Sequence, residues 1–316
     1  MTKLPLYLLT FLLAFSITAC NNATNESDAK KVNGERVYTG QLKVAVDAGL
    51  ENIIKQEAEV FEYLNDSVTL QISYLPEKDV FEAFIKDSAD VMILAREFTQ
   101  KDKNLLRQRD TVYAREQLIA YDAVAMVGNL KFDDSKLDVA TLSKLLEAGN
   151  AGKTELVFES RQSSSVEQVL TLLGYSQKAA ANVYALKSVD EVIDYVEKKE
   201  NVIGFVPYSF LSDTDDDNVK KILKRIKILS LRVKNEKGEE QRTSANQSDI
   251  ATGVYPLRRT VSAVRRYTYR DNRENLFVNF LYREKGAKIF LKAGLIPAKM
   301  PEREINVNTE GIPQGD

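Results

Sequence analysis

The sequence predicts an α/β fold, and three observations support this class. Segments typical of strands alternate with segments of helical periodicity from residue 42 to residue 108. Residues 91–95 form a continuous apolar run of strand length, which is typical of a parallel strand buried on both faces. A long apolar strand ends at residue 127, and the same alternation begins again around it, so two α/β blocks follow one another along the chain.

The first block has three strand-like and three helix-like segments. Apolar side chains recur at helical spacing between residues 50 and 64, Pro76 ends the second strand, and Thr99 is placed to cap the third helix. We therefore expect strands at 42–46, 68–75 and 91–95, and helices at 50–64, 79–86 and 99–108.

The second block begins with a long apolar strand over residues 118–127. Residues 234–249 are polar and charged, which predicts a surface loop, and residues 272–292 predict one long amphipathic helix ending at Gly294. Between and beside these we expect helices at 142–147, 163–173, 189–198 and 218–223, and strands at 156–158, 202–206, 226–231 and 261–267.

Asp122 lies in the middle of the long apolar strand. A buried carboxylate is costly unless it is paired or hydrogen-bonded. The side chain either lines a cleft where the chain passes between lobes or lies in water at a strand end, and the sequence leaves both alternatives open.

The first twenty residues resemble the signal of an exported bacterial lipoprotein. Lys3 precedes an apolar run that is short for a spanning helix, which needs roughly 20 residues. The run closes with Ile17-Thr18-Ala19-Cys20, which resembles a lipobox, so we expect cleavage after residue 19 and lipid on Cys20. A plain membrane anchor with an incidental cysteine is the simpler alternative. The polar stretch that follows predicts a disordered tether.

The composition excludes several catalytic mechanisms and one class of metal site. The chain has no His and its one Cys is Cys20, so His-based catalytic triads, thiolate catalysis outside that position and His-based metal sites are excluded. The net charge of −2 gives no basic field for nucleic acid. We expect no metal, no cofactor and no enzymatic activity, although acid–base work by Asp, Glu, Lys or Tyr stays open.

The most informative segment joins a strand to a helix through Arg161, Gln162 and the serines Ser163, Ser164 and Ser165. The first N–H groups of a helix have no internal partner, and the helix dipole adds positive charge there, so the helix start favours an anion. Arg161 adds a planar fork suited to an oxyanion. One serine also serves as an ordinary N-cap in either interpretation.

Two further loops follow predicted strands. Asp47-Ala48-Gly49 follows the first strand, and Arg96-Glu97 follows the third. Ligands of open α/β sheets bind at the carboxyl ends of strands, so these loops are placed to reach a shared ligand. Asp47 or Glu97 could accept a proton from a protonated oxyanion. A solvated ion pair is the alternative for Arg96 and Glu97.

These segments, in this order, resemble the phosphate-binding proteins of ABC importers, the Pst type, in their lipoprotein form. The resemblance extends from about Leu42 to Pro297. It rests on LKVAVDAGL, ADVMILAREFT, LIAYDAVAMVGN, FESRQSSSVEQVL, VIGFVPYSF and FVNFLYREKGAKIFLKAGLIPA.

The resemblance implies a two-lobed class II periplasmic-binding-protein-like fold with two crossover strands between the lobes. It transfers ligand-binding roles to Arg161 and Ser163–Ser165, and less directly to Arg96, Glu97, Ala48 and Gly49. The expected division is a signal peptide (1–19), a tether (20–37), lobe 1 (38–122 with 258–300), lobe 2 (123–257) and a polar tail (301–316).

The first loop of the family carries Ser or Thr where this chain has Asp47-Ala48-Gly49, and its helix start carries a Gly that is absent between Arg161 and Ser165. These departures leave the identity of the oxyanion open.

We therefore expect a monomeric solute-binding lipoprotein of the cell envelope, anchored on the extracytoplasmic side of a membrane. It would capture phosphate or a related oxyanion for an ABC permease. The alternative is a non-transport interaction or phosphate-sensing lipoprotein, with contacts through residues 234–249 and through Arg258, Arg259, Arg265 and Arg266. A phosphate-ester hydrolase is a third hypothesis, which the missing His, thiol and metal cluster disfavour.

Overall fold

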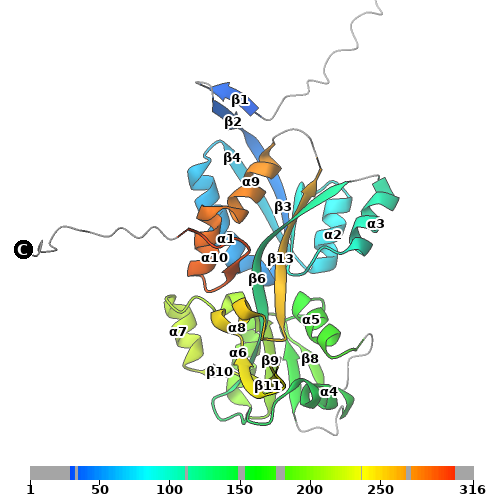
Figure 1. Ribbon diagram of the computed structural model, residues 1–316, viewed down its shortest axis with the longest axis vertical. Coiled ribbons are helices and arrows are strands. Elements are labelled where there is room, and N and C mark those ends of the chain that lie inside the picture. The colour runs from blue at the N-terminus through cyan, green and yellow to red at the C-terminus, as the bar shows by residue number, and fades with distance from the viewer. Residues whose placement is uncertain are drawn as a thin grey trace, which may run out of the picture.

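The computed structural model describes residues 29–32, 35–110, 113–148, 154–175, 182–235, 237–267 and 272–302. Two lobes are stacked along the long axis of the molecule, and two long strands run from one lobe to the other (Figure 1). The expected signal peptide, Cys20 and most of the polar tail lie outside the described residues. Within the described part, the structure has no helix of the length and apolar character that spanning a membrane requires.

One mixed sheet passes through both lobes in the order β4-β3-β5-β13-β6-β9-β7-β8, with β10 and β14 paired to β6. Its strands are β3 (Gly40–Asp47), β4 (Val68–Leu75), β5 (Val91–Leu94), β6 (Ala114–Asn129), β7 (Glu155–Phe158), β8 (Val183–Ala185), β9 (Val202–Pro207), β10 (Ile226–Ile228), β13 (Arg258–Arg266) and β14 (Ile296–Pro297). The helices are α1 (Glu51–Leu64), α2 (Glu77–Ile85), α3 (Gln100–Asp110), α4 (Val139–Ala148), α5 (Ser164–Leu172), α6 (Val189–Lys198), α7 (Asp217–Leu223), α8 (Gln247–Thr252), α9 (Arg273–Tyr282) and α10 (Glu284–Lys292).

The predicted parallel pairing holds at the two ends of this sheet. Strand β3 is parallel to β4 and β5 in the first lobe, and β7 is parallel to β8 and β9 in the second. The central strands β13 and β6 pair antiparallel with each other and with their neighbours β5 and β9. The parallel pairing that the alternation favours is therefore confirmed within each lobe, while the two crossover strands at the centre run in opposite directions.

Strand β6 is the first crossover strand. Its N-terminal part pairs with β13 as far as Ala123, and its C-terminal part pairs with β9 from Val124 onward. Strand β13 returns the chain to the first lobe, with Arg259 directly opposite Asp122 in the register. The fold is thus the two-lobed arrangement that the sequence implied, with β6 and β13 as its two crossovers (Figure 1).

The buried side chains divide at the same place. One cluster runs from Ala123 to Leu257 and takes in Ile296 from the C-terminal segment. The two other clusters draw on residues before 121 and after 260. This division supports the proposed lobe boundaries near residues 122 and 258.

The long C-terminal helix predicted over residues 272–292 is wrong, because the structure has two helices. Arg283 between α9 and α10 has extended backbone (φ −85°, ψ −179°). A Cβ at Gly286 would lie 2.5 Å from the Phe280 carbonyl oxygen, so α10 folds back closely over the end of α9. The predicted end at Gly294 agrees with its left-handed φ of +83°.

Two segments predicted to lack structure contain strands. The polar stretch 234–249 includes β12 (Glu240–Ser244), paired antiparallel with β11 (Ser230–Lys234), and the start of α8. Thr243 on β12 is buried and donates to Asp249, so this stretch is anchored although its composition is polar. Within the expected tether, β1 (Ala29–Val32) pairs with β2 (Glu35–Tyr38), which corrects the prediction of disorder there.

Candidate functional site

A cleft of 290 Å³ lies where the two lobes meet. Its lining comes from the ends of strands and the starts of helices in both lobes, as expected for open α/β sheets. The described lining residues are Asp47, Ala48, Gly49, Glu51, Asn52, Pro76 and Glu77 from lobe 1, and Glu159, Ser160, Gln162, Ser163, Ser164, Lys187, Ser188, Val189, Asp190, Pro207, Ser209 and Phe210 from lobe 2.

The loop after β3 enters the cleft as predicted. Asp47 is 2 % exposed, and its Oδ1 accepts hydrogen bonds from the Gly49 amide (2.8 Å) and from Ser164 Oγ (3.0 Å). The second bond crosses between the lobes. A Cβ at Gly49 would lie 3.0 Å from Asp47 Oδ1 and 3.4 Å from Arg259 Nη2, so close approach explains the Gly at this position.

The start of α5 faces the same cleft. Ser163 is the N-cap and accepts from the Val166 amide (3.4 Å), so the ordinary capping role is confirmed for this serine. Ser164 does more than cap, because its Oγ donates to Asp47 and accepts from Arg259 Nη1 (2.9 Å). Ser165 is fully buried and donates to Glu159 Oε1 (2.7 Å), so it supports the site from behind.

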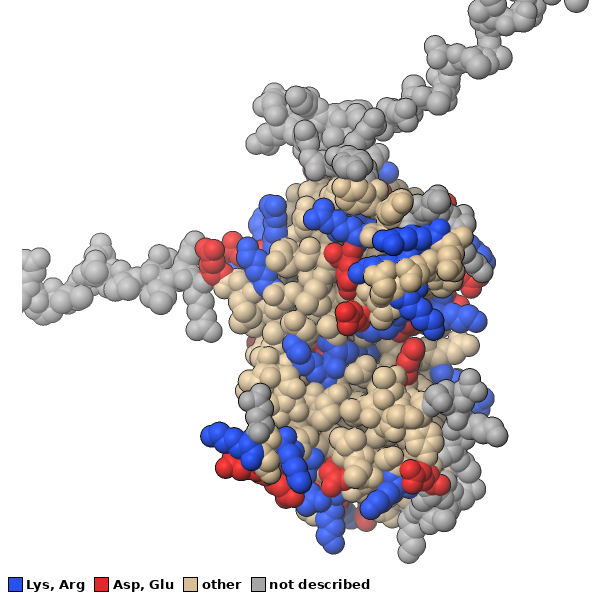
Figure 2. Space-filling model, turned by 45° about the vertical axis from the view of Figure 1, so that its right-hand side comes forward, with Lys and Arg blue, Asp and Glu red and all other residues tan. Residues whose placement is uncertain are grey.

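Arg259 is a buried cation directly behind the cleft, where it contacts Ser164, and the sequence did not indicate this role. It was placed with Arg258, Arg265 and Arg266 in a contact surface, but Arg259 is 3 % and Arg265 5 % exposed, which corrects that prediction. Arg258 stacks 3.7 Å from the centre of the Tyr121 ring. On the face drawn in Figure 2, basic and acidic side chains are interspersed over both lobes.

Asp122 is the partner of Arg259. Arg259 Nε and Nη2 donate to Asp122 Oδ2 at 3.0 and 2.8 Å, and the Ser209 amide donates to Oδ1 at 3.2 Å. Asp122 is fully buried, so the alternative of a carboxylate in water at a strand end is wrong. Burial opposes the charge on Arg259, but the Asp122 and Asp47 carboxylates outweigh it and raise the Arg259 pKa. Only Asp122 carries a sequence signal, as a lone charge in an apolar run, whereas Arg259 follows Arg258 at the start of β13.

Two buried carboxylates flank the start of α5. Asp47 reaches it from β3 and Glu159 from the end of β7, and burial raises the pKa of both. Asp47 Oδ2 and Glu159 Oε2 have no hydrogen-bond partner among the described residues. Sequence reasoning overlooked Glu159, although its place directly after a buried strand matches that of Asp47.

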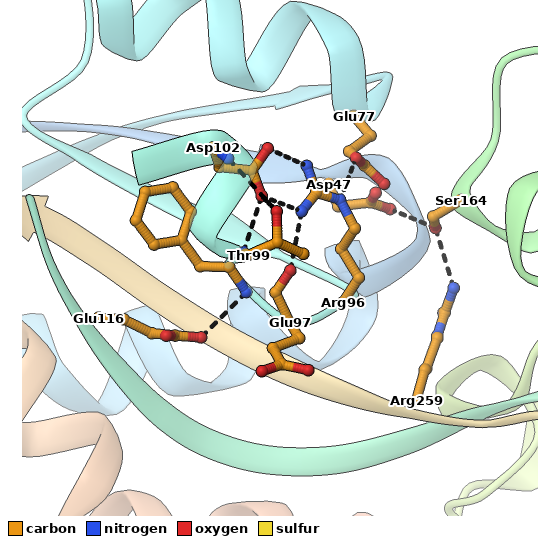
Figure 3. A network of polar contacts seen from close by, with 10 residues as sticks. Asp47, Glu77, Arg96, Glu97, Thr99, Asp102, Glu116, Ser164 and Arg259 are labelled. Atoms are coloured by element: carbon orange, nitrogen blue, oxygen red, sulfur yellow. Dashed lines mark hydrogen bonds and ion pairs between the residues drawn. The ribbon is translucent and has the colours of Figure 1, made fainter. Parts of the chain in front are cut away.

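Arg96 forms its ion pairs with Glu77 and Asp102, and not with Glu97 as the alternative above supposed. Its guanidinium donates to Glu77 (2.5 Å), to Asp102 (2.7 Å) and to the backbone carbonyl of Glu97 (2.8 Å). Figure 3 shows Arg96 between Glu77 and Asp102, with the Glu97 carboxylate turned away. Neither Arg96 nor Glu97 lines the cleft; Arg96 instead ties Glu77 at the start of α2 to α3.

Arg161 also lies outside the cleft. Its side chain is exposed and lines a neighbouring hollow with Lys78 and Tyr175. The structure thus brings together Asp47, Ala48, Gly49, Ser163 and Ser164 around the cleft, with Asp122 and Ser165 directly behind, and leaves out Arg161, Arg96 and Glu97.

The chemistry of the cleft is that of a binding site for a small polar solute. The N–H groups of the first turn of α5 and the Ser163 and Ser164 hydroxyls are donors, and Arg259 supplies positive charge behind them. Within the described ranges, no group of three or more Asp, Glu, Cys or His side chains could hold a metal ion.

Comparison with known families adds one match. The family model described as "PBP superfamily domain" matches residues 31–291. A search of curated protein sequences finds no match.

Several solved structures resemble the chain at low sequence identity. A protein described as a phosphate ABC transporter substrate-binding protein with bound phosphate, from Clostridium perfringens, is 16 % identical (TM-score 0.64; 82 % of this chain and 100 % of that chain covered). An ABC-type phosphate transport receptor from Vibrio cholerae is 17 % identical (TM-score 0.63; 81 % and 99 % covered). PstS from Borrelia burgdorferi is 16 % identical (TM-score 0.54; 82 % and 99 % covered). At these identities the likeness shows the fold.

Proposed function

The chain belongs to the PBP superfamily domain family, and from this premise we propose that it is an extracytoplasmic solute-binding protein of an ABC importer. Its ligand is phosphate or a related tetrahedral oxyanion, held in the cleft between the lobes. Lipid on Cys20 keeps the protein at the membrane surface, where it passes the ligand to the permease.

The start of α5 is the observation that carries the oxyanion assignment. Unpaired N–H groups of a helix start, together with the helix dipole, form an anion site without a Lys. Ser163 and Ser164 lie at this start, on the cleft lining, and Arg259 Nη1 contacts Ser164 Oγ at 2.9 Å. The solved proteins of this fold cited above, described as phosphate receptors or binding proteins, support the choice of oxyanion.

The crossovers support a binding cycle in which the lobes close on the ligand. Asp47 of lobe 1 contacts Ser164 of lobe 2, and Ser209 Oγ of lobe 2 donates to the Gly49 carbonyl of lobe 1 (3.1 Å). The ligand therefore meets groups from both lobes. Hinge motion at β6 and β13 would open and close such a cleft.

Calorimetric titration of the lipid-free protein with phosphate, arsenate, sulfate and molybdate tests this function. We expect saturable heat with phosphate or one of the other tetrahedral oxyanions, and an increase in the melting temperature on the same addition. No heat and no thermal shift with any of them at millimolar concentration would contradict the proposal.

A further inference from the structure

Acidic side chains outnumber basic ones on the described lining of the cleft, which leaves a bare anion few cationic partners there. The acidic residues among its described lining are Asp47, Glu51, Glu77, Glu159 and Asp190, and Lys187 is the basic one. Arg259 lies just behind, but both Nε and Nη2 are bound to Asp122. A bare oxyanion would meet more negative than positive charge here.

Two of these carboxylates have an unmet need for a hydrogen-bond donor. Asp47 and Glu159 are 2 % and 9 % exposed, and each uses one oxygen within the protein. Asp47 Oδ2 and Glu159 Oε2 stay without a partner among the described residues. Buried acceptors of this kind are rare in folded proteins, and on the wall of a cleft a donor group of a ligand can satisfy them.

The charged groups around these two oxygens do not supply the missing hydrogen-bond donor. Glu77, at the start of α2, adds negative charge near Asp47, and Arg96 is already bound to Glu77 and Asp102. Arg259 on β13 is shared among Asp122, Asp47 and Glu159. Lys187 precedes α6 and Glu51 begins α1, and among the described residues neither forms a hydrogen bond with the two free oxygens.

The size of the cleft permits a ligand larger than a single oxyanion. Its 290 Å³ equals the volume of about ten water molecules at roughly 30 Å³ each. A tetrahedral ion at the start of α5 leaves room for a short substituent between the two lobes.

Building on the proposed oxyanion site, we propose that the ligand is a zwitterion, a tetrahedral oxyanion joined by a short alkyl chain to an ammonium group. Asp47 Oδ2 and Glu159 Oε2 receive the ammonium group, and the N–H groups at the start of α5 receive the oxyanion. An ammonium has three donors and no acceptor, which matches two free carboxylate oxygens.

The alternative occupant of this site is a plain oxyanion, which either binds beside protonated carboxyls or donates its own P–OH hydrogen to one of them. Burial raises the pKa of Asp47 and of Glu159, so burial favours the protonated form of both carboxyls. An ammonium would favour the ionised carboxylates and release protons, whereas a plain oxyanion would favour the protonated carboxyls.

Titration calorimetry of the full chain in detergent separates the alternatives. The ligands are 2-aminoethyl phosphate, ethyl phosphate and inorganic phosphate at pH about 8, above the second pKa of ~6 of a phosphomonoester. Two buffers of different ionisation enthalpy give the number and sign of protons exchanged. We expect 2-aminoethyl phosphate to bind roughly tenfold or more tightly than ethyl phosphate, and without the proton uptake that protonated carboxyls would require.

Equal or tighter binding of ethyl phosphate or inorganic phosphate would overturn the zwitterion and leave the oxyanion function standing. No binding of all three ligands would overturn both proposals. The Glu159→Gln variant should bring the affinities for the aminoethyl and ethyl ligands together, whereas Asp190→Asn should keep them apart. Thermal melting checks that both variants fold, and a preference retained in Glu159→Gln and also in Asp47→Asn would contradict the assignment.

Discussion

Asp122 and Arg259 form a fully buried ion pair (Nη2 to Oδ2 2.8 Å) on the two strands that connect the lobes. The two residues lie opposite each other in the register of β6 and β13. Arg259 also donates a hydrogen bond to Ser164, which in turn donates to Asp47. A continuous series of hydrogen bonds thus connects the crossover strands with both walls of the cleft. The geometry of the crossover strands and the geometry of the site therefore depend on the same residues.

Removing one member of this pair should destabilise the fold strongly. Asp122→Asn leaves a buried guanidinium without its charge partner, and losses of about 3–5 kcal/mol are typical of such changes. The double variant Asp122→Leu with Arg259→Met should recover most of this loss, since an apolar pair of similar volume needs no charge compensation. Urea unfolding of the three proteins gives the free energies. A single variant as stable as the wild type would show that the pair is not buried in solution.

Glu57 on α1 gives a second prediction, on the pH dependence of stability. It is fully buried, and neither carboxylate oxygen has a hydrogen-bond partner among the described residues. Burial raises the pKa of Glu57 to about 10. Below pH about 4 both folded and unfolded chains hold the proton, but above it the unfolded chain releases the proton and the folded chain does not until about pH 10. The free energy of unfolding should therefore fall as pH rises across this window.

Glu57→Leu should remove that part of the pH dependence and stabilise the protein at neutral pH. The matched control is Glu59→Leu on the exposed side of the same helix, which should keep the wild-type dependence. Thermal melts at several pH values between about 5 and 9 compare the three proteins. Parallel curves for wild type and Glu57→Leu would mean that Glu57 is ionised in the folded protein.

Gly49 carries a third prediction, on packing at the cleft. An added Cβ would lie 3.0 Å from Asp47 Oδ1, 3.3 Å from Pro207 Cγ and 3.4 Å from Arg259 Nη2. Gly49→Ala should therefore displace the Asp47 carboxylate and weaken ligand binding, with a stability loss of about 1–3 kcal/mol. Ala48→Ser at the exposed neighbouring position is the control and should keep the stability. Wild-type affinity and stability in Gly49→Ala would place these groups further apart than the structure does.

The α/β alternation was predictable from the sequence because most elements carry a clear period or a local cap. The residues of β4 were predicted to the exact bounds, and Thr99 accepts from the Asp102 amide as a cap of α3. The break at Arg283 was not predictable, since the apolar period continues across it and only the contact of Gly286 with Phe280 requires the turn.

The candidate site was predictable only where its residues are neighbours in sequence. The loop Asp47–Gly49 and the serines at the start of α5 each have a local signal. Arg259 and Asp122 are 137 residues apart, and their pairing follows from the register of two crossover strands. Arg161 adjoins the serines in the sequence, yet its exposed side chain lines the hollow beside the cleft and not the cleft itself. A sequence period cannot tell which side of a turn faces a cleft.

The central claim is that an oxyanion binds at the start of α5 inside the cleft, and paired calorimetric titrations with phosphate test it most directly. Ser164→Ala removes a hydroxyl that contacts both Asp47 and Arg259, whereas Arg161→Ala removes a guanidinium outside the cleft. The account predicts that Ser164→Ala weakens binding roughly tenfold or more and that Arg161→Ala stays within about twofold of the wild type. Loss of binding in Arg161→Ala with wild-type affinity in Ser164→Ala would contradict it.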